Sequence, residues 1–179
     1  FNCLKKIMQF KGFQKTSLIE YTGKIASIVW VAGCNFRCPF CYNVGLVMNS
    51  DEIESVSEEK ILDHLKKTKD WTDALAITGG EPTLQKDLPE FIKKVKNMGL
   101  LVELETNGTN PDMLKQLIDS KMIDYIAMDI KAPLNFEDYQ KATNIKDRQL
   151  FENIKKSIKM VMRSRIDYEF RLTVVPTLH

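Results

Sequence analysis

Three of the four cysteines in the chain lie within eight positions of one another. They are Cys34, Cys38 and Cys41, with the spacing C-x3-C-x2-C. Three thiolates so close in sequence can converge on one soft-metal centre, and both zinc sites and iron–sulfur clusters use such ligands. A structural zinc ion normally takes four protein ligands, and no other cysteine or histidine lies near these three. The spacing therefore favours a metal centre with one open coordination position.

Two simpler interpretations of the cysteines compete with this one. Cysteine is often just a small buried apolar residue, although that does not account for three of them in one segment. A structural zinc ion with Cys3 as its fourth ligand is the stronger competitor. Cys3 stands alone far upstream, and on spacing alone this alternative stays open.

The cysteines and three other distinctive segments each follow an apolar run. The other three are Gly79-Gly80-Glu81-Pro82, Glu105-Thr106-Asn107-Gly108 and Asp129-Ile130-Lys131. Short, β-branched apolar runs are typical of buried strands. Strands are expected at 25–31, 74–78, 101–105, 123–130 and 168–175.

Segments with helical spacing of apolar residues lie between these runs. Ser57 and Asn110 can cap two of the helices, Gly99 is placed to end the one between them, and a further helix begins near Arg148. The alternation predicts an α/β fold with five parallel strands and right-handed crossovers, either an open sheet or part of a barrel. In both arrangements the active site lies at the carboxyl ends of the strands, where the four distinctive segments are expected.

Composition excludes several other classes of protein. Hydrophobic residues make up 44% and charged residues 28% of the chain, as in ordinary globular proteins. The formal net charge of +2 gives no electrostatic reason to expect nucleic acid or an anionic membrane as a partner. No apolar run approaches the roughly 18 residues of a membrane span, and no signal peptide is evident. We therefore expect a single cytoplasmic domain over residues 1–179.

The motifs together resemble a known family. The C-x3-C-x2-C motif, with Phe40 before its last cysteine, and Gly79-Gly80-Glu81-Pro82 resemble the signatures of radical S-adenosylmethionine enzymes. Segments 12–21 and 31–39 are similar to those of the activating proteins of anaerobic ribonucleoside-triphosphate reductases, a branch of the glycyl-radical activating enzymes. The resemblance extends over nearly the whole chain.

This resemblance implies both a fold and a reaction. The implied fold is a partial (β/α)6 barrel with parallel strands, truncated here after the fifth. Cys34, Cys38 and Cys41 would hold a [4Fe–4S] cluster whose fourth iron binds S-adenosylmethionine. Reductive cleavage would give a 5′-deoxyadenosyl radical that removes a hydrogen from a glycine of the partner reductase. A low-potential donor such as flavodoxin or ferredoxin would supply the electron.

Further residues are assigned to the cofactor by the same resemblance. Phe40 and Tyr42 would pack against the adenine. Gly79 and Gly80 would let the backbone approach the cofactor closely, and Glu81 would accept a hydrogen bond from its ammonium group.

Residues at later strand ends complete the expected site. Thr106, Asn107, Asp129 and Lys131 would contact the ribose and the methionine carboxylate, and Lys131 suits the carboxylate by charge. Two alternatives stay open, because Asp129 and Lys131 can form an ordinary ion pair and 106–108 is also a common turn sequence. Glu105 stands where some activating enzymes have Asp, and Thr177 where Gly is usual, so the resemblance is weaker at these positions.

Two other functions are compatible with the sequence. A radical S-adenosylmethionine enzyme could modify a different protein or a small molecule, since the shared motifs do not distinguish substrates. A non-enzymatic domain could use the cysteines for structural zinc.

Overall fold

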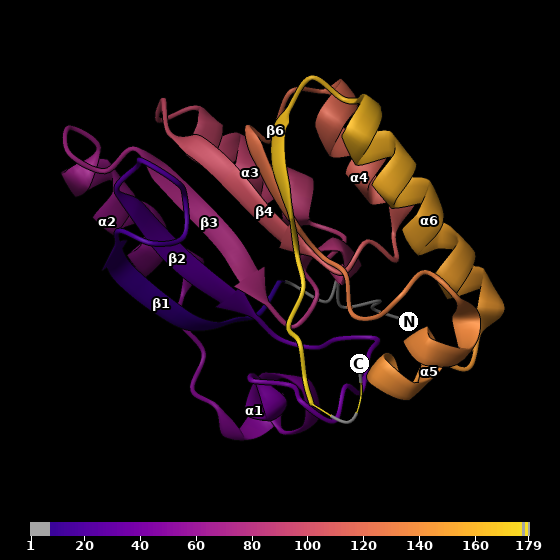
Figure 1. The fold of residues 1–179 in the computed structure, drawn as a ribbon. Coiled ribbons are helices and arrows are strands. Elements are labelled where there is room, and N and C mark those ends of the chain that lie inside the picture. Colours follow the sequence, from indigo (N-terminus) through magenta and orange to yellow (C-terminus); the bar gives the residue numbers. More distant parts are fainter. Residues whose placement is uncertain (1–7, 177, 179) are drawn as a thin grey trace, which may run out of the picture.

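A curved sheet of six strands organises the chain, with the strands in sequence order from one edge to the other (Figure 1). The computed structural model describes residues 8–176 and 178. The strands are β1 (Phe10–Ser17), β2 (Ala26–Val31), β3 (Ala74–Gly79), β4 (Leu101–Thr106), β5 (Tyr125–Asp129) and β6 (Asp167–Arg171). β2 to β6 are parallel, as the alternation predicts, and β1 pairs antiparallel with β2. β1 and β6 form the two edges of the sheet, which is therefore not closed into a barrel.

Helices cover the convex face of the sheet and the ends of its strands. They are α1 (Val44–Met48), α2 (Glu58–Thr68), α3 (Leu88–Lys96), α4 (Pro111–Asp119), α5 (Phe136–Thr143) and α6 (Arg148–Arg163), with 3-10 turns at Ser50–Glu52 and Pro82–Leu84. In Figure 1, α2 and α3 lie behind the sheet, α4 and α6 pack side by side to its right, and α1 and α5 lie beyond the carboxyl ends of the strands. None of the helices among residues 8–176 and 178 is long and apolar enough to span a bilayer.

The main core lies between the sheet and these helices. Side chains on the helix-facing side of the central strands, such as Ile77, Leu104 and Met128, are fully buried. Alternate residues of the same strands point to the concave face. On β4 these are Glu103 and Glu105, so one strand contributes to both the core and the concave interior.

The helix ends predicted from Ser57, Asn110 and Gly99 are confirmed. The Ser57 side chain accepts a hydrogen bond from the Lys60 amide at the start of α2, and Asn110 accepts one from the Met113 amide at the start of α4. α3 ends at Lys96, and Gly99 turns the chain with a φ of +83°. Such a left-handed conformation favours glycine.

Several element boundaries differ from the expectation. The strand expected at 123–130 is confined to residues 125–129, and the last strand covers 167–171 rather than 168–175. Residues 172–175 continue beyond the end of β6, outside any strand. β1, α1 and α5 were not predicted. Cys3 and Thr177 lie outside the described residues.

Candidate active site

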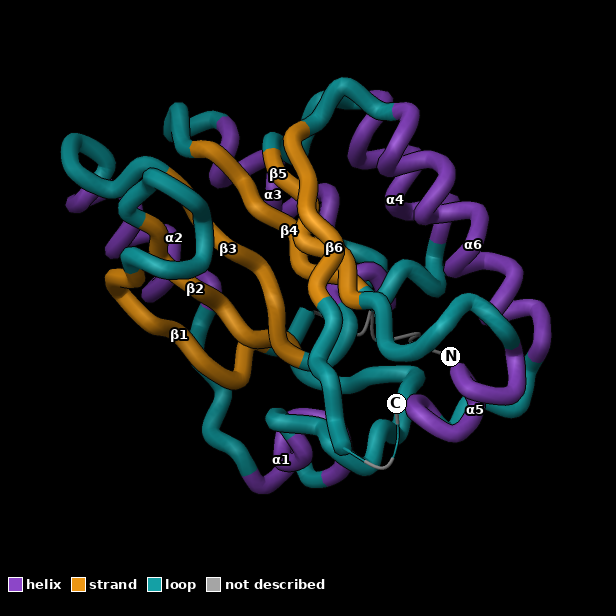
Figure 2. The backbone as a smooth tube through the Cα atoms, in the orientation of Figure 1, coloured by secondary structure: helices purple, strands orange, loops and turns teal. Residues whose placement is uncertain are grey.

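The loops that follow β2 to β5 meet at one end of the sheet (Figure 2). They enclose a cavity of about 400 Å³, within the range usual for ligand sites. All the residues assigned to the site from sequence line this cavity. They are Cys34, Cys38, Phe40, Cys41, Tyr42, Gly79, Gly80, Glu81, Thr106, Asn107, Asp129 and Lys131. The structure therefore brings the four distinctive segments together, while the role of each residue stays a prediction.

The three thiols are free and partly exposed in the loop after β2. The Cys41 amide donates to the Cys38 carbonyl at 3.1 Å, which turns the loop between these two residues. Burial raises the pKa of Cys34 and of Cys38 to about 11, so both thiols are protonated at neutral pH unless a metal displaces the protons. Within residues 8–176 and 178, no three His, Cys, Asp or Glu side chains are gathered closely enough to hold a single metal ion.

The Gly79-Gly80 turn is explained by its contact with the segment before the first cysteine. The Gly80 amide donates to the Val31 carbonyl at 2.9 Å, and the Glu81 amide donates to the Gly33 carbonyl at 2.8 Å. A Cβ at Gly80 would lie 1.8 Å from the Gly33 carbonyl oxygen. The two glycines therefore leave backbone, rather than side chains, facing both the cysteine segment and the cavity.

Glu81 is a buried centre of hydrogen bonds that joins two loops. Its Oε1 accepts from the Thr83 amide, the Thr83 hydroxyl and the Thr106 hydroxyl, at 3.1, 2.5 and 2.7 Å. Its Oε2 accepts from the Asn107 amide at 2.7 Å. Burial raises the pKa of Glu81 and these donors oppose the rise; four donors facing the carboxyl group suit the ionised form. Oε2, with one donor, has the remaining capacity to accept from a ligand.

The charged pair at the end of β5 forms the ion pair that was considered as an alternative. Lys131 Nζ lies 2.9 Å from Asp129 Oδ2, and both side chains line the cavity. The paired geometry is compatible with a cofactor contact, because a carboxylate and an ammonium at a cavity wall can each bind a group of opposite charge.

The two aromatic residues of the cysteine loop differ in their surroundings. Phe40 packs partly against the core, whereas the Tyr42 side chain is fully exposed at the cavity rim. Of these two residues, only Phe40 is held by packing against the core. Asn43, which sequence analysis did not single out, donates from Nδ2 to the Gly79 carbonyl at 3.3 Å and ties the cysteine loop to the glycine turn.

Beside the cavity lies a layer of charged groups that sequence analysis missed. Arg171 on β6 contacts Glu103 and Glu105 on β4, with its Nη2 3.2 Å from Glu103 Oε1. It also contacts Glu169 on its own strand and Glu20 in the β1–β2 connection. The only sequence signal for this layer was the pair of glutamates at alternate positions of an otherwise apolar strand.

Glu103 is the most deeply buried member of this layer. Its side chain is fully buried, and its Oε2 has no hydrogen-bond partner among the described residues. Burial, reinforced by the nearby Glu105 carboxylate, raises the pKa of Glu103 to about 8 in spite of Arg171. The layer therefore holds at least one carboxyl group that is protonated at neutral pH.

Comparison with known proteins decides the family. Residues 28–179 match the family model of the Radical SAM superfamily. The chain belongs to this superfamily. This confirms the resemblance inferred from the motifs, and the open, mostly parallel sheet agrees with a partial radical SAM barrel.

Two curated relatives illustrate the range of this superfamily. The chain is 32% identical over 168 residues to a Methanocaldococcus jannaschii protein that carries the provisional name glycyl-radical enzyme activating enzyme MJ1227. That match covers 92% of this chain and 68% of the relative. A 7-carboxy-7-deazaguanine synthase of Hyperthermus butylicus is 34% identical over 92 residues, covering 51% of this chain and 38% of the enzyme.

Solved structures show the same radical SAM fold. TYW1 with a lysine–pyruvate adduct bound superposes with a TM-score of 0.63 at 19% identity, covering 86% of this chain and 57% of that one. Native anSMEcpe with bound AdoMet gives a TM-score of 0.56 at 20% identity, covering 78% of this chain and 41% of that one. The superposed part thus covers a little over half of TYW1 and less than half of anSMEcpe.

Membership of the radical SAM superfamily implies a [4Fe–4S] cluster and S-adenosylmethionine as cofactors. The residues present fit both groups. Three thiols at one cavity wall are the ligands that a cluster with one open iron requires. The missing side chains of Gly79 and Gly80 let this turn lie directly against Val31 and Gly33, so its backbone forms a wall of the cavity beside the cysteines.

Proposed function

We propose that this radical SAM protein is an activating enzyme that generates a glycyl radical on a partner protein, an anaerobic ribonucleoside-triphosphate reductase. The observation that carries the proposal is the 32% identity with the activating-enzyme relative over 92% of this chain. The match to the deazaguanine synthase covers only 51% of the chain. The similarity to the activating-enzyme relative therefore extends well beyond the shared motifs.

Different residues of the chain would bind the cluster and the methionine moiety of the cofactor. Cys34, Cys38 and Cys41 would hold the cluster, which together with S-adenosylmethionine supplies a 5′-deoxyadenosyl radical when reduced. The backbone at Gly79 and Gly80 and the free capacity of Glu81 Oε2 would bind the amino group of the methionine moiety. A cofactor of this kind leaves the protein to orient and shield the reacting groups rather than to act as acid or base.

The remaining cavity walls would fix the rest of the cofactor. Lys131, paired with Asp129 at 2.9 Å, would face the methionine carboxylate. Thr106 would lie near the ribose, and Phe40 would pack against the adenine ring. A low-potential protein such as flavodoxin or ferredoxin would deliver the electron. We also propose that residues 1–179 form one radical SAM core domain, since all six strands share a single sheet.

The direct test is electron paramagnetic resonance of a mixture of the two proteins. The anaerobically reconstituted protein, S-adenosylmethionine, a chemical reductant and an anaerobic reductase should give a glycyl radical doublet. Two controls should give none: Cys38→Ala in this protein, and Gly→Ala at the radical position of the reductase. Formation of 5′-deoxyadenosine without a glycyl radical, in the presence of a competent reductase, would contradict the proposal and favour a different substrate.

A further inference from the structure

A closed ring of hydrogen bonds joins the loop after β4 to the cysteine loop. Asn107 Oδ1 accepts from the Thr109 amide at 3.0 Å and from the Thr109 hydroxyl at 2.7 Å. The Thr109 hydroxyl accepts from Asn35 Nδ2 at 2.8 Å, and Asn35 Oδ1 accepts from Asn107 Nδ2 at 2.9 Å. Each of the three side chains therefore donates one hydrogen bond to the next and accepts one from the previous side chain of the ring.

This ring fixes the orientation of the Asn107 amide. Rotating the amide by half a turn would place its NH2 group against the Thr109 amide N–H, two donors facing each other. Asn107 and Thr109 are 5% and 3% exposed, so water does not compete for these groups. One N–H of Asn107 Nδ2 is used by Asn35. The other is left to face the sulfur of Cys34, which lies 3.8 Å from Nδ2.

Cys34 also receives a hydrogen bond from the backbone. The Phe36 amide donates to Cys34 Sγ at 3.4 Å. The sulfur therefore faces two N–H donors, one from its own loop and one from the loop after β4. Hydrogen bonds to the thiolates of an iron–sulfur cluster stabilise its more negative, reduced form and raise its reduction potential.

We propose that Asn107 is a positioning residue that raises the reduction potential of the cluster by donating its second N–H to Cys34 Sγ. Both N–H groups and Oδ1 of Asn107 are engaged in this arrangement, so its side chain has no free donor for S-adenosylmethionine. The residue would act through the Cys34 sulfur, with Asn35 and Thr109 holding its amide in the required orientation. The inference depends on Cys34 being a cluster ligand and is independent of which partner the enzyme activates.

The test is a redox titration of the reconstituted full chain, followed by electron paramagnetic resonance of the reduced cluster. Asn107→Leu and Asn107→Ala both remove the two N–H donors without adding a charge. Both variants should have a lower midpoint potential than the parent protein. At the solution potential where half of the parent clusters are reduced, the ratio of reduced to oxidised cluster should fall severalfold.

A matched control distinguishes a change of midpoint potential caused by the lost hydrogen bond from one caused by a less stable loop. Asn153 on α6 donates from Nδ2 to the Thr109 carbonyl at 3.1 Å, so Asn153→Leu weakens the support of the ring without removing a donor to sulfur. This variant should unfold more easily and keep the parent midpoint potential. An unchanged potential in the Asn107 variants, or an equal shift in Asn153→Leu, would overturn the inference. If Asn107→Leu does not fold, Asn107→Ala decides the question, and an unaltered cluster in Cys34→Ala would overturn both the inference and the ligand assignment.

Discussion

At the scale of single residues, the geometry of the site depends on the close contact between the backbones of Gly80 and Gly33. The missing side chain of Gly80 lets the glycine turn after β3 lie against Gly33, the residue before the first cysteine. The neighbouring Glu81 then reaches across to the loop after β4 with its carboxylate. Two adjacent residues thus connect three of the four loops around the cavity.

Replacement of Gly80 by alanine should disrupt this contact. The new Cβ would lie 1.8 Å from the Gly33 carbonyl oxygen, so the backbone on one side must shift. We expect the variant to lose about 3 kcal/mol of unfolding free energy, as overpacking against backbone does. Denaturant unfolding of the protein without cofactors measures this.

Gly45 in α1 offers a matched control for that experiment. A Cβ there would meet only the terminal methyl group of Ile53, at 3.4 Å. Gly45→Ala should leave the stability within about 1 kcal/mol of the parent protein, because alanine favours a helix. Equal stability of the two variants would contradict the close-packing account of Gly80.

Glu103 should make the stability of the protein depend on pH. Its carboxyl group has a pKa of about 8 in the folded protein and 4.5 as its usual value. Between these values the unfolded chain releases a proton that the folded protein keeps, so the free energy of unfolding falls as pH rises from about 5 to 8. Each pH unit contributes at most about 1.4 kcal/mol, and we expect a total loss of about 3 kcal/mol.

Glu103→Gln isolates this effect from other titrating groups. The amide does not titrate, so the variant should lose clearly less stability than the parent protein over the same pH range. Urea unfolding at pH 5, 6.5 and 8 gives the comparison. Parallel stability curves for the two proteins would show that Glu103 does not carry the raised pKa.

At the scale of elements, Arg171 connects the edge strand β6 to β4 through ion pairs. Its guanidinium group contacts two glutamates of β4 and one of β6, and it lies beside Glu20 in the β1–β2 connection. A planar group with several donors can hold several carboxylates at once, which a lysine ammonium does less well. The concave face of the sheet is thus crossed by one connected set of charges.

Arg171→Met should destabilise the protein by about 2 kcal/mol, because it removes the guanidinium group that Glu103, Glu105 and Glu169 share and leaves the partly buried Glu105 carboxylate without a counter-ion. The loss should be smaller by about 1 kcal/mol when Glu103 is already glutamine, since neighbouring groups of one network are not additive. A double-mutant cycle at pH 8 measures this coupling. Arg171→Lys serves as the control that keeps the charge, and additive losses in the cycle would contradict a direct interaction with Glu103.

The elements also show what could be predicted from sequence. The five parallel strands and the caps at Ser57 and Asn110 were predictable because each depends on a local pattern. α5 was not predicted, although Asn135 caps its start and Asn144 ends it with a left-handed φ of 56°. β1 was missed because an edge strand with mixed polarity lacks the continuous apolar pattern of a buried strand.

The site was predictable to a different extent. The motifs place the cysteines and the glycine turn at strand ends, and the structure brings all of them to one cavity. The ring around Asn107 and the contacts of Arg171 join residues 72 and 66 positions apart in the sequence, respectively. No local pattern predicts such pairs, since they join strands or loops that are not adjacent in the sheet and depend on its curvature.

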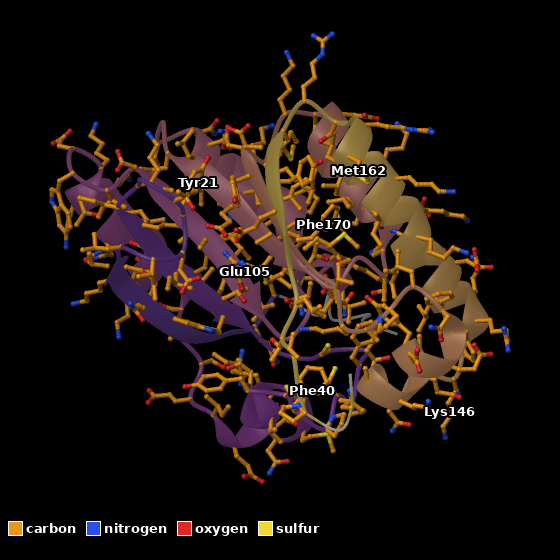
Figure 3. All side chains as sticks on the ribbon, viewed as in Figure 1. Tyr21, Phe40, Glu105, Lys146, Met162 and Phe170 are labelled. Carbon is orange, nitrogen blue, oxygen red and sulfur yellow. The ribbon has the colours of Figure 1, made fainter. Side chains whose placement is uncertain are left out.

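At the scale of the whole molecule, the concave side of the sheet is built in levels along the strands. Tyr21 and Tyr125 pair near the amino ends, with ring centroids 5.1 Å apart. The Arg171 layer follows, and the cavity lies at the carboxyl ends. Figure 3 shows Tyr21, Glu105 and Phe40 at successive levels of this arrangement. The aromatic pair and the Arg171 layer thus lie below a cavity that opens at the end of the sheet where the cysteines lie.

The end of the sheet at which the cysteines lie should bind a [4Fe–4S] cluster and S-adenosylmethionine together. The most direct measurement is anaerobic reconstitution with iron and sulfide, followed by metal analysis and by electron paramagnetic resonance of the reduced protein with and without S-adenosylmethionine. We predict about four irons per chain, a cluster signal that changes when S-adenosylmethionine is added, and loss of that signal in Cys38→Ala. Tightly bound zinc without a cluster, or a cluster signal that S-adenosylmethionine leaves unchanged, would contradict the account.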